Sequence, residues 1–115
     1  MNIYCRHFTL IWVFVVTGLF AAEPAGFFKT YCLRCHNADK QKGKQRLDTL
    51  TLPIDATGNA KACLDVYEQL NIQEMPPEDA DSQPTGAERS AMINWLGTEL
   101  AHAGVVYDQH MLDRP

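Results

Sequence analysis

Two cysteines three residues apart, followed at once by a histidine, constrain this chain more than any other feature of its sequence. The run is Cys32-Leu33-Arg34-Cys35-His36. On one helical turn, two thiols at this spacing can each add to one of the two vinyl groups of a haem, and the histidine that follows can donate an imidazole nitrogen to the iron. The sequence therefore predicts one covalent haem c on Cys32 and Cys35, with His36 as an axial iron ligand.

Three other interpretations of the same residues stay open at this point. A zinc site could use Cys32, Cys35 and Cys63 with a histidine, although four-ligand zinc sites usually supply two well-separated pairs and the second pair is missing. A thioredoxin-like dithiol would need a strand before the pair and a βαβ frame, and neither is visible. A plain structural disulfide beside an incidental histidine is the third. The alternative to haem is thus a small structural or metal-binding module.

The first residues of the chain have the layout of an export signal. A short stretch with one arginine, Arg6, precedes an apolar run from Phe8 to Phe20, which is the order found in secretory signal peptides. The run is shorter than the ~20 residues that a membrane-spanning helix needs. Residues 1–22 are therefore predicted to be a signal peptide cleaved near Ala22, with membrane attachment as the alternative if the segment is retained. The mature protein is expected to be exported, periplasmic or otherwise extracytoplasmic, where haem is attached covalently.

Size and charge limit what the remaining chain can do. Removing residues 1–22 from the 115 leaves 93 residues, and it removes one positive charge from a formal net charge of −4. A chain of this size builds only a modest core, which a covalently held apolar cofactor would help to stabilise. The acidic balance argues against nucleic acid as a partner. It is compatible with docking on a basic patch of a redox protein.

Helical spacing of apolar residues is the main local pattern of the predicted mature chain. It runs through about residues 24–36, again through 60–72, and then from Thr85 to Gly104. The last segment opens with the Thr-x-x-Glu pattern of a capping box. Residues 37–59 show no sustained period, and no segment alternates as a strand does. The fold class is therefore predicted to be all-α, with about three to four helices and long loops around one haem.

The predicted domain spans residues 23–104, and residues 105–115 are expected to form a tail. The last helix directs a set of apolar side chains towards a core, namely Met92, Ile93, Trp95, Leu96, Leu100 and Ala103. If Cys32 and Cys35 are used for another purpose, Cys63 stands alone and is predicted to be a small buried apolar residue.

Met75 is the candidate for the second axial ligand of the iron. It follows the helix predicted over residues 60–72 and precedes Pro76 and Pro77, which cannot continue a helix and which stiffen the segment. A thioether on such a loop can be aimed at the iron from the face opposite His36. The alternative is that Met75 fills a gap in the core. His102 is the alternative iron ligand, but it lies near the end of the last helix and is expected at the surface.

Several short motifs in one order resemble the planctomycete-type cytochrome c domain. They are Tyr31 to Asn37, Lys42-Gly43, Arg46 to Thr49, Glu74 to Pro77, Gln83-Pro84 and Glu88 through Leu96. The resemblance implies a small class I-like cytochrome c fold. It also implies covalent haem through Cys32 and Cys35, with His36 as the proximal and Met75 as the distal ligand. In this family the first and last helices meet, here near Phe28 and Leu96.

The remaining site predictions are less direct. Arg46 is a candidate partner for a haem propionate, because a guanidinium suits a carboxylate. Leu47, Leu70 and Trp95 are candidates for the apolar wall around the porphyrin. With both axial positions filled the iron has no place for a substrate, so the expected function is extracytoplasmic electron transfer, not enzymatic catalysis. If Met75 does not bind the iron, the alternative is a haem-based sensor of small ligands.

Overall fold

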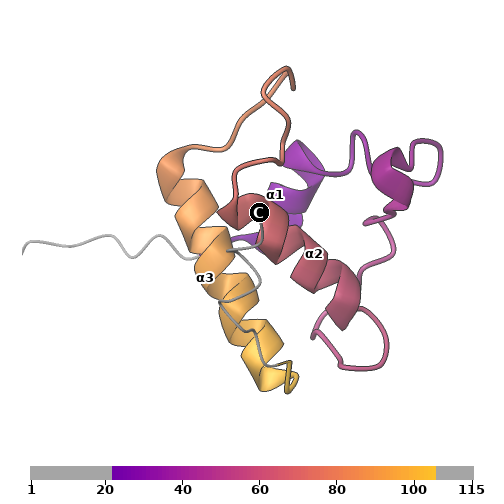
Figure 1. Cartoon of the computed structure of the whole chain (residues 1–115), viewed down its shortest axis with the longest axis vertical. Coiled ribbons are helices and arrows are strands. Elements are labelled where there is room, and N and C mark those ends of the chain that lie inside the picture. Colours follow the sequence, from indigo (N-terminus) through magenta and orange to yellow (C-terminus); the bar gives the residue numbers. More distant parts are fainter. Residues whose placement is uncertain (1–21, 106–115) are drawn as a thin grey trace, which may run out of the picture.

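The computed structural model describes residues 22–105, and within this range it contains helices but no strand (Figure 1). The elements are α1 (Pro24–Tyr31), a short 3₁₀ helix η1 (Lys42–Lys44), α2 (Ala60–Asn71) and α3 (Gly86–His102). The all-α prediction is confirmed. The signal peptide predicted over 1–22 lies outside the described residues except for Ala22, as does the predicted tail except for Val105.

The helix α1 begins as its sequence predicts and ends sooner. Pro24 occupies its first turn, and the Glu23 side chain accepts a hydrogen bond of 2.6 Å from the Gly26 amide. The predicted helix to His36 is wrong at its end, because α1 stops at Tyr31. Beyond it the chain folds into turns, in which the amides of Cys35 and His36 both donate to the Cys32 carbonyl, at 3.2 and 3.1 Å.

The other two helices lie close to their predicted positions. α2 runs from Ala60 to Asn71, whereas the sequence predicts 60–72. Beyond its end, the Glu74 amide donates to the Gln69 carbonyl at 3.1 Å. α3 begins with the predicted capping box. The Thr85 hydroxyl accepts from the Glu88 amide at 3.1 Å, and the Glu88 carboxylate accepts from the Thr85 amide at 2.8 Å.

Thr85→Ala is expected to lower the free energy of unfolding by about 1 kcal/mol, because the mutant leaves a donor of the first turn of α3 without its acceptor. Urea denaturation followed by circular dichroism measures this. Ser90→Ala, at an exposed position of the same helix, is the control and should change stability by less than about 0.5 kcal/mol. Equal effects of the two changes would contradict the role of the cap.

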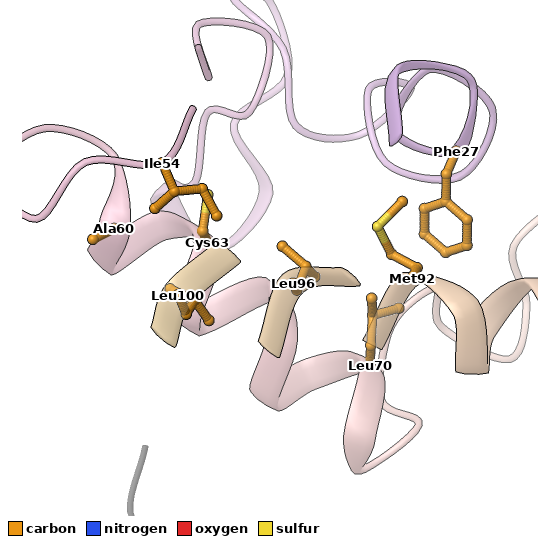
Figure 2. Packing of buried hydrophobic residues seen from close by; sticks show 8 residues of the cluster. All are labelled: Phe27, Ile54, Ala60, Cys63, Leu70, Met92, Leu96 and Leu100. Atoms are coloured by element: carbon orange, nitrogen blue, oxygen red, sulfur yellow. The ribbon is translucent and has the colours of Figure 1, made fainter. Parts of the chain in front are cut away.

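The hydrophobic core lies where α3 packs against α2 and α1 (Figure 1). Its buried members are Phe27, Ile54, Ala60, Cys63, Leu70, Met92, Leu96 and Leu100 (Figure 2). Leu96 is fully buried, and the Phe27 ring lies beside Met92. The first and last helices are in contact, as the resemblance implies. Phe27, the neighbour of Phe28, is the buried aromatic residue of α1, whereas Phe28 is half-buried. Met92 and Cys63 are core residues, as predicted.

The long connection between α1 and α2 contains η1, and its second half is held by short-range turns. Its Asn59 is buried and fixes the end of the loop, because its side chain accepts from the Asp55 amide at 3.0 Å and donates to the Thr51 carbonyl. The Asp55 carboxylate in turn accepts from the amides of Thr57 and Gly58. These bonds place Ile54 over the core.

Among the residues that the structure describes, no helix combines the length and the apolar character required to cross a membrane.

Candidate functional site

A cavity of about 570 Å³ opens between the turn that follows α1, one face of α2 and the loop that follows α2. Pockets that hold small molecules and cofactors usually measure ~300–1,000 Å³. Cys32, Cys35, His36 and Met75 all line it. The four residues for which the sequence predicts haem attachment and iron binding therefore meet at one place, although Met75 is far from the others in the sequence.

The predicted apolar wall is present in part. Leu47 and Leu70 line the cavity and are 7% and 2% exposed. Trp95 does not line it and packs against the hydrophobic core instead. Arg46 also lies outside the lining, where its guanidinium binds both carboxylate oxygens of Asp48, at 2.8 and 3.1 Å. This pairing lowers the pKa of Asp48, and contact of Arg46 with a propionate stays a prediction.

The ring of His36 is oriented by a backbone carbonyl. Its Nδ1 atom lies 3.3 Å from the Gln45 carbonyl oxygen. Because a carbonyl oxygen can only accept, Nδ1 must carry the proton when this hydrogen bond forms. The lone pair of the neutral ring is then on Nε2, the nitrogen that remains free to bind a metal. Such a second contact fixes the tautomer and the direction of a histidine ligand.

The segment that supplies this carbonyl is itself fixed on both sides. The Leu47 amide donates to the His36 carbonyl at 2.9 Å, and the Gln45 side chain donates to Asp65 of α2 at 2.9 Å. Sequence reasoning did not find Gln45. Its contribution to His36 comes from the backbone, which every residue type has, so the side chain gives no signal for this role.

Asn37 closes the turn that contains the two cysteines. Its side-chain amide donates to the Leu33 carbonyl at 2.6 Å, and its side-chain oxygen accepts from the amides of Asp39 and Lys40 at 2.9 and 2.8 Å. Asparagine commonly makes such contacts in turns. The sequence did contain this signal, since Asn37 directly follows His36 in a segment without helical or strand periodicity.

The thiols of Cys32, Cys35 and Cys63 are not joined in disulfides. Burial raises the pKa of the Cys32 thiol to about 12 and that of Cys63 to about 11. Cys63 is 2% exposed and belongs to the core, apart from the cavity that Cys32 and Cys35 line. Within residues 22–105, no group of three or more His, Cys, Asp and Glu side chains is placed to hold a metal ion.

Opposite charges lie on the two sides of the cavity. Arg34 and Lys42 line it on the side of the cysteines, whereas the acidic residues Asp65, Glu68, Asp79 and Asp81 line it on the side of α2 and the following loop. An ion pair of 2.7 Å between Arg34 and Asp81 joins the two sides. Both side chains are mostly exposed, so this pair contributes little to stability.

The donor set of the cavity fits a c-type haem. It offers two thiols three residues apart in the sequence, a histidine whose Nε2 is free, and a methionine thioether, which is a ligand of haem iron in cytochromes. Met75 is 37% exposed because it faces an open cavity. Leu47 and Leu70 supply the apolar surface that a porphyrin requires.

Comparison with known families agrees with this donor set. Residues 32–79 match the family model of planctomycete cytochrome c. This chain carries a planctomycete-type cytochrome c domain. The matched segment begins at Cys32 and includes Met75, so it contains all four residues of the predicted haem site. No curated protein and no solved structure shows a match to the chain. A cytochrome c domain is a haem-binding electron-transfer module, and it implies haem c as the cofactor.

The buried thiol of Cys63 is expected to make the free energy of unfolding of the cytochrome c domain depend on pH. An unfolded cysteine titrates near pH ~8.5, whereas folded Cys63 titrates at about 11. Between these values the unfolded chain binds fewer protons, so stability is unaffected below pH ~8.5 and falls as the pH rises above it. From pH 7 to 10 we expect Cys63 to account for a loss on the order of 2 kcal/mol.

Urea denaturation of the haem-loaded protein at the two pH values measures this loss. Cys63→Ala is the matched variant, because it removes the titrating thiol and leaves the other groups in place. Wild type should lose more stability than Cys63→Ala on going to pH 10. An identical loss in both proteins would show that Cys63 does not titrate in this way.

Proposed function

We propose that the protein is a monohaem c-type cytochrome that carries single electrons, or admits them to a larger system, outside the cytoplasmic membrane. The observation that supports this best is the meeting of Cys32, Cys35, His36 and Met75 in one cavity of suitable volume. When bound, the haem supplies a one-electron iron couple. The chain has to hold the haem, set its axial ligands and exclude water from it.

Each residue then has a defined task. The Cys32 and Cys35 sulfurs would hold the macrocycle through thioethers, since a thiol can add across a vinyl double bond without loss of atoms. His36 presents Nε2 to the iron because Gln45 holds Nδ1–H. Met75 would supply a thioether to the iron, and a thioether ligand raises the reduction potential.

This ligation leaves no iron position for a substrate, and we therefore assign the protein no enzymatic activity. The expected partners are redox proteins that meet the cavity edge briefly. Export of the chain, directed by residues 1–22, would place it where haem c is attached. The acidic residues on one side of the cavity, Asp79 and Asp81 among them, suit a partner with a basic patch and are unsuited to nucleic acid.

The experiment is expression of the full chain with a c-haem maturation system, followed by a reduced pyridine haemochrome spectrum. We expect the spectrum of haem held by two thioethers, and a far-red Met–iron charge-transfer band in the ferric protein. Covalent haem without this band would favour the alternative, a sensor that binds a small ligand at the open position. Absence of covalent haem would favour a structural or metal-binding module.

A further inference from the structure

Arg89 of α3 contacts the loop that carries Met75. Its Nη1 atom donates to the Met75 carbonyl at 2.8 Å and to the Leu70 carbonyl at 3.3 Å. The side chain is half-buried between α3 and the end of α2. Hydrogen bonds from a charged group are stronger than those between neutral groups. The bonds therefore tie the Met75 loop to the first turn of α3.

The Pro76 ring is buried, but few backbone hydrogen bonds hold the Met75 loop. Pro76 and Pro77 have no amide hydrogen, so neither residue can donate a backbone hydrogen bond. On one side the Glu74 amide donates to α2, and on the other the Pro77 carbonyl accepts from the Gln83 side chain at 2.6 Å. Met75 lies between these two anchored residues in the chain, and Arg89 donates directly to its backbone carbonyl.

The second carbonyl that Arg89 contacts belongs to the last turn of α2. Carbonyls at this end of a helix lack the usual partners within the helix, and the Leu70 carbonyl accepts from the Gln73 amide at 3.3 Å as well as from Arg89. Leu70 also lines the cavity with its side chain. Arg89 therefore fixes the end of α2 and the Met75 loop relative to each other, and these are two of the elements that surround the cavity.

The residue before Arg89 makes a comparable contact on the other side of the cavity. Glu88 accepts a hydrogen bond of 3.1 Å from the hydroxyl of Tyr31, which directly precedes Cys32. The first turn of α3 is thus bonded both to the segment of the cysteines and to the segment of the methionine, although none of its residues lines the cavity.

We propose that Arg89 is a positioning residue for the distal iron ligand, which holds the Met75 carbonyl so that the thioether stays on the iron. This inference rests on the proposed function, since it requires haem and ligation by Met75. Without the guanidinium, the loop should leave the iron more often while the rest of the domain remains folded. A ligand from solution should then compete with Met75 more successfully.

The test uses the full chain loaded with haem, in wild type, Arg89→Gln, Arg89→Lys and Lys29→Gln. Lys29 is an exposed cation of α1 that does not line the cavity, so its variant controls for the lost charge. Two quantities are measured on the ferric protein, the far-red Met–iron band and the affinity for added imidazole. Circular dichroism checks that each variant is folded. If the Arg89 bonds were purely structural, their loss would lower stability without increasing the affinity for imidazole.

We expect Arg89→Gln to weaken the band and to bind imidazole about tenfold more tightly than wild type, a change of about 1.4 kcal/mol. Arg89→Lys keeps the charge on a shorter side chain without the guanidinium fork. It should retain the band and bind imidazole about threefold more tightly. Lys29→Gln should behave as wild type.

Each remaining outcome decides one question. A wild-type protein with covalent haem but without the band would refute ligation by Met75, and therefore the function on which this inference rests. A wild-type band with the same imidazole affinity in Arg89→Gln and Lys29→Gln would overturn the role of Arg89 alone. If Arg89→Gln yields no folded haem protein, Arg89→Lys decides, and wild-type imidazole affinity in that variant would overturn the inference.

Discussion

Alanine at both Cys32 and Cys35 is expected to give a chain that carries no haem after denaturation. These two thiols line the cavity beside His36, and no thioether can form without them. A haem stain of the denaturing gel should detect the wild type and miss the double variant. The reduced pyridine haemochrome of the same preparations should give the same result in solution.

Cys63→Ala is the matched control for this experiment. It removes the third described thiol, which lies in the core and not in the cavity, so its haem content should equal that of the wild type. Haem that stays on the denatured double variant would refute attachment at the two cysteines. Loss of haem from Cys63→Ala, in a protein that still folds, would show that a different pair of thiols is used.

Met75→Ala is expected to lower the reduction potential of the haem by on the order of 0.1 V or more, within the ~0.8 V range that axial ligands set. The variant replaces the thioether by water or by a ligand from solution, and a thioether favours the reduced iron more than these do. Redox titration followed by visible absorption measures the shift. The far-red Met–iron band should disappear, and the covalent haem should remain.

Met92→Leu provides the comparison for this variant. Met92 is 1% exposed in the core, and an exchange for leucine of similar volume usually costs less than about 1.5 kcal/mol. Its band and potential should stay close to those of the wild type. An unchanged band in Met75→Ala would mean that another residue binds the iron opposite His36.

Local patterns predicted most of the helical structure. The apolar face of α2 and the capping box of α3 each depend on residues three or four positions apart, so both could be found without knowledge of the rest of the fold. The end of α1 could not. Cys32 and Cys35 continue the helical spacing of the apolar residues, yet the Leu33 amide reaches back to the Phe28 carbonyl at 2.9 Å and the chain turns.

The site was predictable wherever a side chain supplies the chemistry. Cysteine, histidine and methionine have few roles at such spacings, and the structure brings them to one cavity. Gln45 acts through its carbonyl and Arg89 through contact with other carbonyls, and sequence patterns do not report such bonds. Trp95 shows the converse, because its large apolar side chain suits a haem wall, yet it packs against the core and does not line the cavity.

Leu70 is at once a member of the core and part of the cavity wall. No layer of protein therefore separates the interior of this small domain from the space that the cofactor would fill. Haem would fill the cavity and complete the packing of the core. A chain without haem would expose apolar surface to proteases and to other chains. In a cell the supply of haem would then determine how much of the protein survives, as well as how much of it can carry electrons.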